Sequence, residues 1–264
     1  YLAQARFFVD IRGQQPNYLE QEQKRPNFRH LFPEFAESQI DYMQAHLPVR
    51  EQNTAEGHAV RAVYLYCAMA DLALLYNDGQ LLRQCEILWE NIVEKRMYIT
   101  GSIGSSGFWE RFTTDYDLPN DANCSETCAS IGLARFGLRM ARATGQAKYI
   151  DVVERALYNT VRAGMQHTGD RYFYVNPLEV WPANCMPHTS RAHVKPVRQK
   201  WFEVACCPTN MARTFTCLGQ YMSTIEPDAL YAVAYKNLTV PTKRVVTDCV
   251  IPVIMKNTKQ NDSR

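Results

Sequence analysis

Apolar side chains recur every three or four positions along the chain up to residue 225, which is the spacing of amphipathic α-helices. The opening stretch YLAQARFFVDIRG keeps this spacing up to a glycine, as at the end of a helix. The same spacing predicts further helices over residues 34–45, 54–77, 80–95, 124–143, 146–163 and 207–225. We therefore expect a mainly α-helical fold.

Two pairs of predicted helices repeat one pattern. A Gly-Gln dipeptide stands between the helical stretches of each pair, at residues 79–80 and 145–146, and glycine is common where a helix ends and the chain turns. A similar face follows each turn, with Glu86, Asn91 and Val93 spaced like Glu154, Asn159 and Val161. The sequence therefore predicts a repeated helical hairpin.

Short segments of β-like composition interrupt the helical pattern. They are MYIT at 97–100, RYFYVN at 171–176, WFEVA at 201–205 and the alternating stretch ALYAVAY at 229–235. Stacked helical hairpins with such inserts are typical of an α/α toroid, in which the inner helix ends and their loops line one concave face. Beyond Tyr235 the hydrophobic pattern weakens, and the polar end MKNTKQNDSR predicts a loose tail.

Composition and charge exclude several classes of protein. The 264 residues are 46% hydrophobic, which is enough for one large core. A net charge of +2, spread along the chain, favours neither nucleic acid nor an anionic membrane as a partner. No apolar run reaches the roughly 20 residues of a membrane span. Nine irregularly spaced cysteines argue against a secreted disulfide framework and for reduced thiols, so we expect a cytoplasmic protein.

Candidate chemistry is concentrated in a polar segment, GSIGSSGFWERFTTDYDLPNDANCSETC, which predicts a long ordered loop leading into a helix near Cys124. Its carboxylates include Glu110 and Glu126. Since zinc accepts thiolate and carboxylate ligands in a tetrahedral shell, Glu126 and Cys128 could form a site with the adjacent Cys206 and Cys207. On spacing alone, the alternative is that these cysteines are small buried hydrophobic residues and Glu126 is a solvated helix residue.

Four long blocks of the chain, in this order, resemble the β-L-arabinofuranosidases of glycoside hydrolase family 127. They are EGHAVRAVYLYCAMADLA, YITGSIGSSGFWERFTTDYDLPNDANCSETCASIG, YFYVNPLE and HVKPVRQKWFEVACCPTNMAR. The resemblance covers residues 1 to about 235 and implies an (α/α)6 barrel that binds zinc. It therefore favours the zinc interpretation of the cysteines.

The resemblance also implies roles for single residues. Zinc would be held by Glu126, Cys128, Cys206 and Cys207. Cys206 would also be the nucleophile of a retaining glycosidase, with Glu110 as the general acid/base. The sugar-contacting histidine and tyrosine of the family fall on His58 and Tyr174. The partner would be a small carbohydrate.

The chain departs from the family pattern in two ways. Trp109 precedes Glu110 where a small residue is usual, and Glu203 stands where glycine is more familiar. Family members are also much longer, so the chain looks like a fragment. Residues 1–226 would be part of the catalytic barrel, and residues 227–264 the start of a β-rich region. The full-length protein could form a homodimer.

Two other functions remain compatible with the sequence. One is an α/α-toroid sugar epimerase or isomerase that uses His58 with a carboxylate and no metal. The other is a non-catalytic carbohydrate-binding module with a structural zinc, whose four closed ligands would need no additional carboxylate such as Glu110 beside them.

Overall fold

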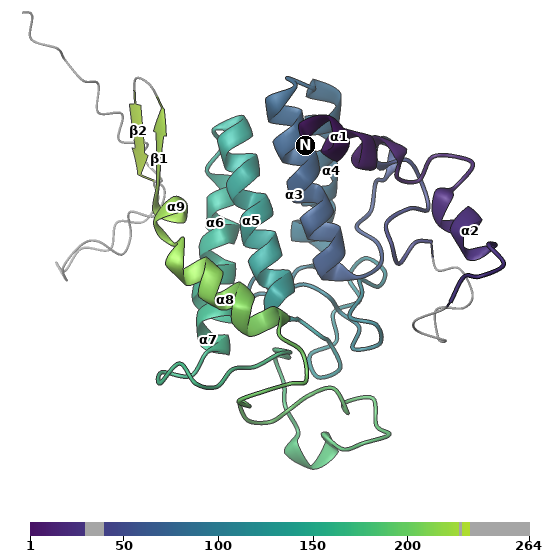
Figure 1. Ribbon diagram of the computed structural model, residues 1–264. Coiled ribbons are helices and arrows are strands. Elements are labelled where there is room, and N and C mark those ends of the chain that lie inside the picture. Colours follow the sequence, from purple (N-terminus) through teal and green to yellow (C-terminus); the bar gives the residue numbers. More distant parts are fainter. Residues whose placement is uncertain (30–39, 227–228, 233–264) are drawn as a thin grey trace, which may run out of the picture.

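Two helical hairpins lie side by side at the centre of the molecule in the computed structural model, which describes residues 1–29, 40–226 and 229–232 (Figure 1). α3 (Ala59–Leu75) and α4 (Gly79–Asn91) form the first hairpin, and α5 (Thr127–Thr144) and α6 (Lys148–Arg155) form the second. α3 packs against α5, so the two hairpins share one core. The prediction of a mainly α fold with a repeated hairpin is confirmed.

The turn of each hairpin contains a glycine, and the first turn also contains a side chain that caps the following helix. Asp78 precedes α4 and its carboxylate accepts a hydrogen bond from the Leu81 amide at 2.9 Å, while Gly79 is the first helical residue. Gly145 ends α5 with φ of 69°, in the left-handed region that glycine tolerates, and its amide donates to the Ala141 carbonyl. Both predicted turns are therefore confirmed.

The repeat extends beyond the hairpins themselves. α4 continues into a π-helical segment at Ile92–Arg96, and α6 continues into another at Ala156–Val161 before α7 (Arg162–Gly164). An isolated β-bridge follows each one, joining Met97 to Ile103 and Met165 to Tyr172. The two units therefore enter the loop region with related geometry.

Large aromatic side chains fill the core between the hairpins. The Trp89 ring meets Phe136 and Tyr149 edge-on, with ring centroids 5.4 and 5.0 Å apart. All three side chains are buried. α3 and α5 approach closely because Gly132 has no side chain, and a methyl group at that position would overlap the Val63 side chain. This packing fixes the N-terminal ends of α3 and α5 beside each other.

The remaining elements surround this centre. The loops after the two hairpins lie at the end of the molecule where α3 and α5 begin, and α8 packs against α5 near that end (Figure 1). In the described part of the chain no helix is long and apolar enough to cross a membrane. The elements are α1 (Leu2–Ile11), α2 (Tyr18–Gln23), α8 (Cys206–Thr216), α9 (Gly219–Met222), β1 (Ser223–Glu226) and β2 (Ala229–Ala232), with 3-10 turns at Val49–Glu51 and Pro182–Asn184.

Several predicted elements differ in the structure. Residues 40–44 form turns rather than the end of a helix over 34–45, because the buried Gln44 amide bonds the carbonyls of Tyr42 and Glu56 and holds the chain in a turn. The first part of that prediction, residues 34–39, lies outside the described residues. The predicted helix over 207–225 ends earlier, since residues 223–226 pair with β2 as β1.

The predicted β segments are shorter than expected. Residues 97–100 and 171–176 contribute isolated bridges rather than strands, and residues 201–205 form no strand. Of the stretch 229–235, β2 covers Ala229–Ala232. Residues 233–264, including the predicted tail, lie outside the described residues.

Candidate metal centre and active site

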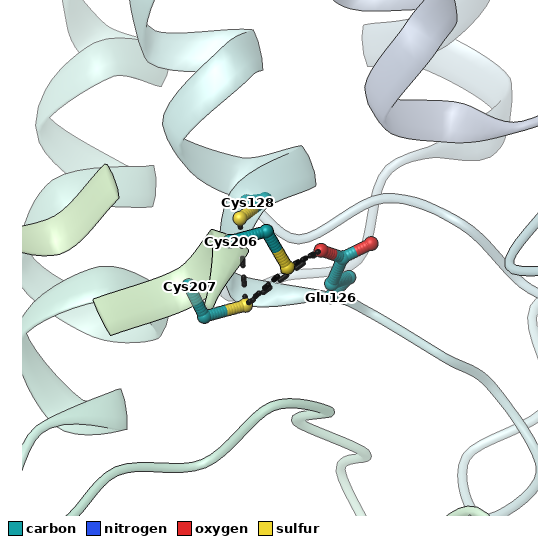
Figure 2. A group of neighbouring side chains, drawn as sticks. All are labelled: Glu126, Cys128, Cys206 and Cys207. Atoms are coloured by element: carbon teal, nitrogen blue, oxygen red, sulfur yellow. Dashed lines mark hydrogen bonds between the residues drawn. The ribbon is translucent and has the colours of Figure 1, made fainter. Parts of the chain in front are cut away.

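Four potential ligands meet where two helices begin. Glu126 immediately precedes α5 and makes no capping hydrogen bond, and Cys128 lies in the first turn of that helix. Cys206 and Cys207 are the first two residues of α8. Figure 2 shows the three sulfurs and one Glu126 oxygen directed at one another. The partial positive charge of a helix N-terminus favours thiolates and carboxylates at such a position.

The distances within this group fit a tetrahedral ion. The sulfur of Cys207 lies 3.4 Å from that of Cys128 and 3.9 Å from that of Cys206. Glu126 Oε1 lies 3.5 and 3.6 Å from the Cys206 and Cys207 sulfurs. With zinc–sulfur bonds of about 2.3 Å, tetrahedral geometry separates two sulfurs by about 3.8 Å and a sulfur from a carboxylate oxygen by about 3.6 Å. All four ligand atoms lie within 4.8 Å of one another.

Burial makes this group of acids costly without a cation. Glu126, Cys128 and Cys207 are buried, while Cys206 is exposed. Burial raises the pKa of Glu126 well above its usual range, and the charges of Glu110 and Cys206 raise it further. Glu126 Oε2 is buried and has no hydrogen-bond partner among the described residues. A bound cation would compensate these charges, so the donor set fits a metal ion.

The three thiols are not equivalent. Hydrogen bonds with Cys128 and Cys207 hold the pKa of Cys206 far below its usual value. The pKa of Cys207 is raised by its hydrogen bonds with Cys128 and Cys206 and by burial. Cys206, the most exposed residue of the group, therefore also has the thiol whose pKa is lowered.

The turn before α5 is fixed by a strand-like segment. Val175 forms an isolated bridge with Glu126, and the Thr127 amide donates to the Tyr174 carbonyl at 2.9 Å. The Asn176 side chain donates to the Ser125 carbonyl at 2.9 Å. The YFYVN segment therefore positions the ligand Glu126 as well as its own tyrosine.

A second group of side chains surrounds the Glu110 carboxylate. The Tyr174 hydroxyl donates to Oε1 at 2.8 Å, and His58 Nε2 lies 3.1 Å from Oε2. His58 Nδ1 accepts the Arg61 amide at the start of α3, so a neutral His58 carries its proton on Nε2 and donates to Glu110. Burial, then the charges of Glu126 and Glu110, raise the pKa of Tyr174, which stays a phenol. Its hydroxyl can therefore donate to an ionised Glu110 or accept from a protonated one.

The backbone fixes Glu110 against the start of α3. The Ala59 amide donates to the Glu110 carbonyl at 3.0 Å, and the Phe112 amide donates to the Gly57 carbonyl at 2.9 Å. Glu110 itself has φ of 55°, which is uncommon for a residue other than glycine. Such conformations persist where the surroundings impose them, often at functional sites.

Glu126 joins the two groups. Ligand atoms of His58, Glu110 and Glu126 lie within 4.8 Å of one another, and Glu126 also contacts the sulfurs. The Glu110 carboxylate and the Cys206 thiol therefore lie on either side of one buried glutamate. The Cys206 sulfur is also part of the lining of an open cavity of ≈ 480 Å³.

The structure thus brings together every residue that the sequence singled out for the site. It also adds residues that the sequence did not indicate. Asn210 and Arg213 of α8 and Tyr64 of α3 line the cavity and bond to one another. The only sequence signal for these residues was helical spacing, in the segment after the cysteine pair for Asn210 and Arg213 and in the predicted helix over 54–77 for Tyr64. Two other acids of the same loop form ion pairs, Asp115 with Arg96 at 2.7 Å and Asp121 with Arg191.

Comparison with known proteins relates this fold and site to one family. The profile of the GH127 β-L-arabinofuranosidase catalytic domain matches residues 1–220. A non-reducing end β-L-arabinofuranosidase from Bifidobacterium longum subsp. longum is 40% identical over 224 residues, which are 85% of this chain and 34% of that protein.

Solved structures agree with this match. A GH127 β-L-arabinofuranosidase from Geobacillus stearothermophilus T6 is 50% identical, with a TM-score of 0.84 over 89% of this chain and 36% of that one. A second GH127 β-arabinofuranosidase is 38% identical, with a TM-score of 0.73 over 89% of this chain and 32% of that one.

The mainly α fold is that of part of a GH127 catalytic domain, and in this chain it carries the cysteine–carboxylate group. The chain belongs to the GH127 β-L-arabinofuranosidase family. It spans about a third of the length of the relatives to which it was matched.

Proposed function

We propose that the chain carries the catalytic centre of a retaining glycoside hydrolase that releases β-L-arabinofuranose, or a similar sugar, from oligosaccharides or glycoconjugates. The observation that carries this proposal is the convergence of a metal-type Cys and Glu group with a hydrogen-bonded Glu110 around the shared Glu126. A structural metal site alone would not require that second carboxylate.

Zinc suits this donor set, and the residues that would hold it are Glu126, Cys128, Cys206 and Cys207. When bound, zinc would remove the thiol protons and balance the negative charge of the buried ligands. The spacing of the four ligand atoms supports this assignment.

The chain's own residues supply two successive displacements. The Cys206 thiolate attacks the anomeric carbon while Glu110 donates a proton to the departing glycosidic oxygen, so a carbon–sulfur bond replaces the carbon–oxygen bond. Glu110 then takes a proton from a water molecule, whose oxygen displaces the sulfur. The Cys206 thiolate is restored, and two inversions leave the sugar with its original anomeric configuration.

His58 and Tyr174 orient the acid/base group in this scheme. Both hydrogen-bond the Glu110 carboxylate, and both lie where a sugar beside Glu110 would meet them. We assign them the contacts to the sugar hydroxyls. The proposal also places α3 to α6 and α8 in an (α/α)6 toroid, which their repeated hairpins support.

The test is elemental analysis of the purified chain together with turnover of a chromogenic β-L-arabinofuranoside. We expect one zinc per chain and release that depends on Glu110. Stoichiometric zinc and sugar binding without any release would instead favour a carbohydrate-binding module. A chain with neither metal nor release would favour a metal-free sugar epimerase that uses His58.

Three further aspects stay predictions. They are the cytoplasmic location, a homodimer of the full-length protein, and the division between a barrel over residues 1–226 and a β-rich region over 227–264. Size measurement of the full-length protein in solution would test the homodimer.

A further inference from the structure

Four aromatic rings form a row that ends beside Glu110. The exposed Phe108 ring stacks on Trp109, with centroids 4.6 Å apart and planes 20° apart. Trp109 meets Tyr42 edge-on at 5.7 Å, and Tyr42 meets His58 edge-on at 5.6 Å. His58 is hydrogen-bonded to Glu110. The row therefore leads from solvent to the histidine at the acid/base carboxylate.

Phe108 is 67% exposed although its loop is held firmly in place. The Ser106 amide donates to the Arg111 carbonyl at 3.2 Å, and the Ser106 hydroxyl accepts the Phe108 amide at 3.0 Å. Gly107 lies against the His193 ring, since a Cβ at that position would overlap it. The aromatic pair is thus presented to solvent by a braced turn.

The backbone of this turn is strained where it passes from the aromatic pair to the catalytic carboxylate. Trp109 and Glu110 have consecutive positive φ angles of 57° and 55°. Strain of this kind persists at ligand-binding and catalytic positions because the surrounding contacts impose it. The conformation sets the aromatic pair and the Glu110 carboxylate in one fixed relation.

We propose that Phe108, supported by Trp109, binds the leaving group of the substrate, and that this leaving group is a sugar ring. The inference rests on the proposed function, in which Glu110 protonates the glycosidic oxygen. An acid must lie within hydrogen-bond reach of the oxygen that it protonates, so the group attached to that oxygen lies beside the Glu110 loop.

The chemistry of the surface selects the ligand. The face of an aromatic ring carries partial negative charge, and the C–H bonds on one face of a sugar ring pack against it. Phe108 is at the far end of the row from His58. It therefore suits the second sugar of an oligosaccharide rather than the arabinose that is released.

The experiment compares two substrates that share the same terminal β-L-arabinofuranose. One is a disaccharide, and the other is the methyl glycoside, which has no ring in its leaving group. Catalytic efficiency kcat/KM is measured for both, and the ratio of the two values is the readout. We expect Phe108→Ala to lower the ratio of disaccharide to methyl glycoside about fivefold, as the loss of one aromatic contact predicts.

Two further variants control the measurement. Phe108→Tyr keeps the ring and should keep the ratio. Phe7→Ala removes a similarly exposed phenylalanine on the distant α1, which is 57% exposed. This variant should leave kcat/KM unchanged for both substrates. A ratio unchanged in Phe108→Ala would overturn the inference and leave the proposed function standing.

If the wild-type chain turns over neither substrate, the proposed function fails and binding decides the inference separately. The disaccharide is then titrated while tryptophan fluorescence is followed. Weaker binding to Phe108→Ala than to wild type and Phe7→Ala would support the sugar surface. Equal binding, or none to the wild type, would overturn it.

Discussion

The roles of Cys206 and Glu110 differ in what each residue binds. Cys206 belongs to the sulfur group, whereas Glu110 is bonded to His58 and Tyr174. We expect Cys206→Ser to abolish turnover and weaken zinc binding. Glu110→Gln should lower kcat by about 10²- to 10⁴-fold and leave the zinc content unchanged. Zinc per chain and kcat are measured for both variants, and equal loss of zinc in the two would contradict these roles.

Asn210 connects the cavity to the metal ligands. Its Oδ1 accepts the Tyr64 hydroxyl at 3.1 Å and a hydrogen bond from Arg213, and its side chain also hydrogen-bonds the Cys128 thiol. Groups that orient metal ligands typically contribute 10- to 100-fold in metal affinity. We expect Asn210→Ala to weaken zinc binding by about that factor, measured by competition with a chelator.

A matched control for Asn210 lies on the same helix. Thr216 of α8 is exposed and, within the described part of the chain, its hydroxyl bonds only to backbone carbonyls of its own helix. Thr216→Ala should leave the zinc affinity unchanged. If both variants lost zinc to the same extent, the effect would come from α8 itself and not from the contact of Asn210 with Cys128.

At the residue scale, the sequence indicated which thiols and carboxylate would meet, but not their environment. Two short pairs stand out in the sequence, Glu126 with Cys128 and Cys206 with Cys207. Their thiol and carboxylate groups suggested a metal. Tyr64 and Asn210 are 146 positions apart, so their hydrogen bond depends on how α3 and α8 pack. No local pattern of the sequence contains that information.

At the scale of elements, Asp78 both caps α4 and binds Arg50. Its carboxylate accepts the Leu81 amide at 2.9 Å and the Arg50 guanidinium at 2.7 Å. Asp78→Ala should lower the free energy of unfolding by about 1 kcal/mol or more, as loss of a helix cap does. Asp78→Asn keeps the cap and loses the charge, so it should lower the free energy of unfolding less than Asp78→Ala does. Urea unfolding at neutral pH measures both.

The same carboxylate predicts a dependence of stability on pH. The hydrogen bond from Arg50 is the main cause that lowers the pKa of Asp78 below its usual value of about 3.9. The unfolded chain then binds the proton more readily, so this contribution is present above about pH 4 and is lost as the pH falls through the folded pKa. Asp78→Asn should lack that acid-dependent loss, and an unchanged pH profile would contradict the assignment.

Helical spacing predicted α3 to α6 well because each presents a continuous apolar face to one core. It did not predict the π-helical segments at Ile92–Arg96 and Ala156–Val161. A π-helical turn holds about one more residue than an α-helical turn but uses the same kinds of residue, so the sequence does not distinguish the two. The β-like segments failed as strands for another reason. Aromatic and β-branched residues at 171–176 fit a strand, but only single partner residues lie opposite them.

At the scale of the whole molecule, the metal group and the sugar site differ in how much chain they need. All four ligands lie between residues 126 and 207, and this chain spans about a third of its relatives. We therefore expect this chain to bind one zinc ion and to have a much lower kcat/KM than the full-length Bifidobacterium longum relative. Zinc content and kcat/KM are measured side by side, and equal efficiency would show that the shared segment is sufficient.

The positions of the four ligands have a mechanical consequence. Cys128 and Cys207 are 79 residues apart, and both are buried at the same point between α5 and α8. An ion bound there would tie the intervening chain into a closed ring, as a disulfide bridge would. By the chain-entropy argument, a cross-link around a loop of this size stabilises the folded state by about 4.5 kcal/mol. The Cys206 sulfur proposed to attack the sugar is one of the ligands of the ion that would then fasten α8 to α5, so losing the ion would loosen the architecture as well as stop the chemistry.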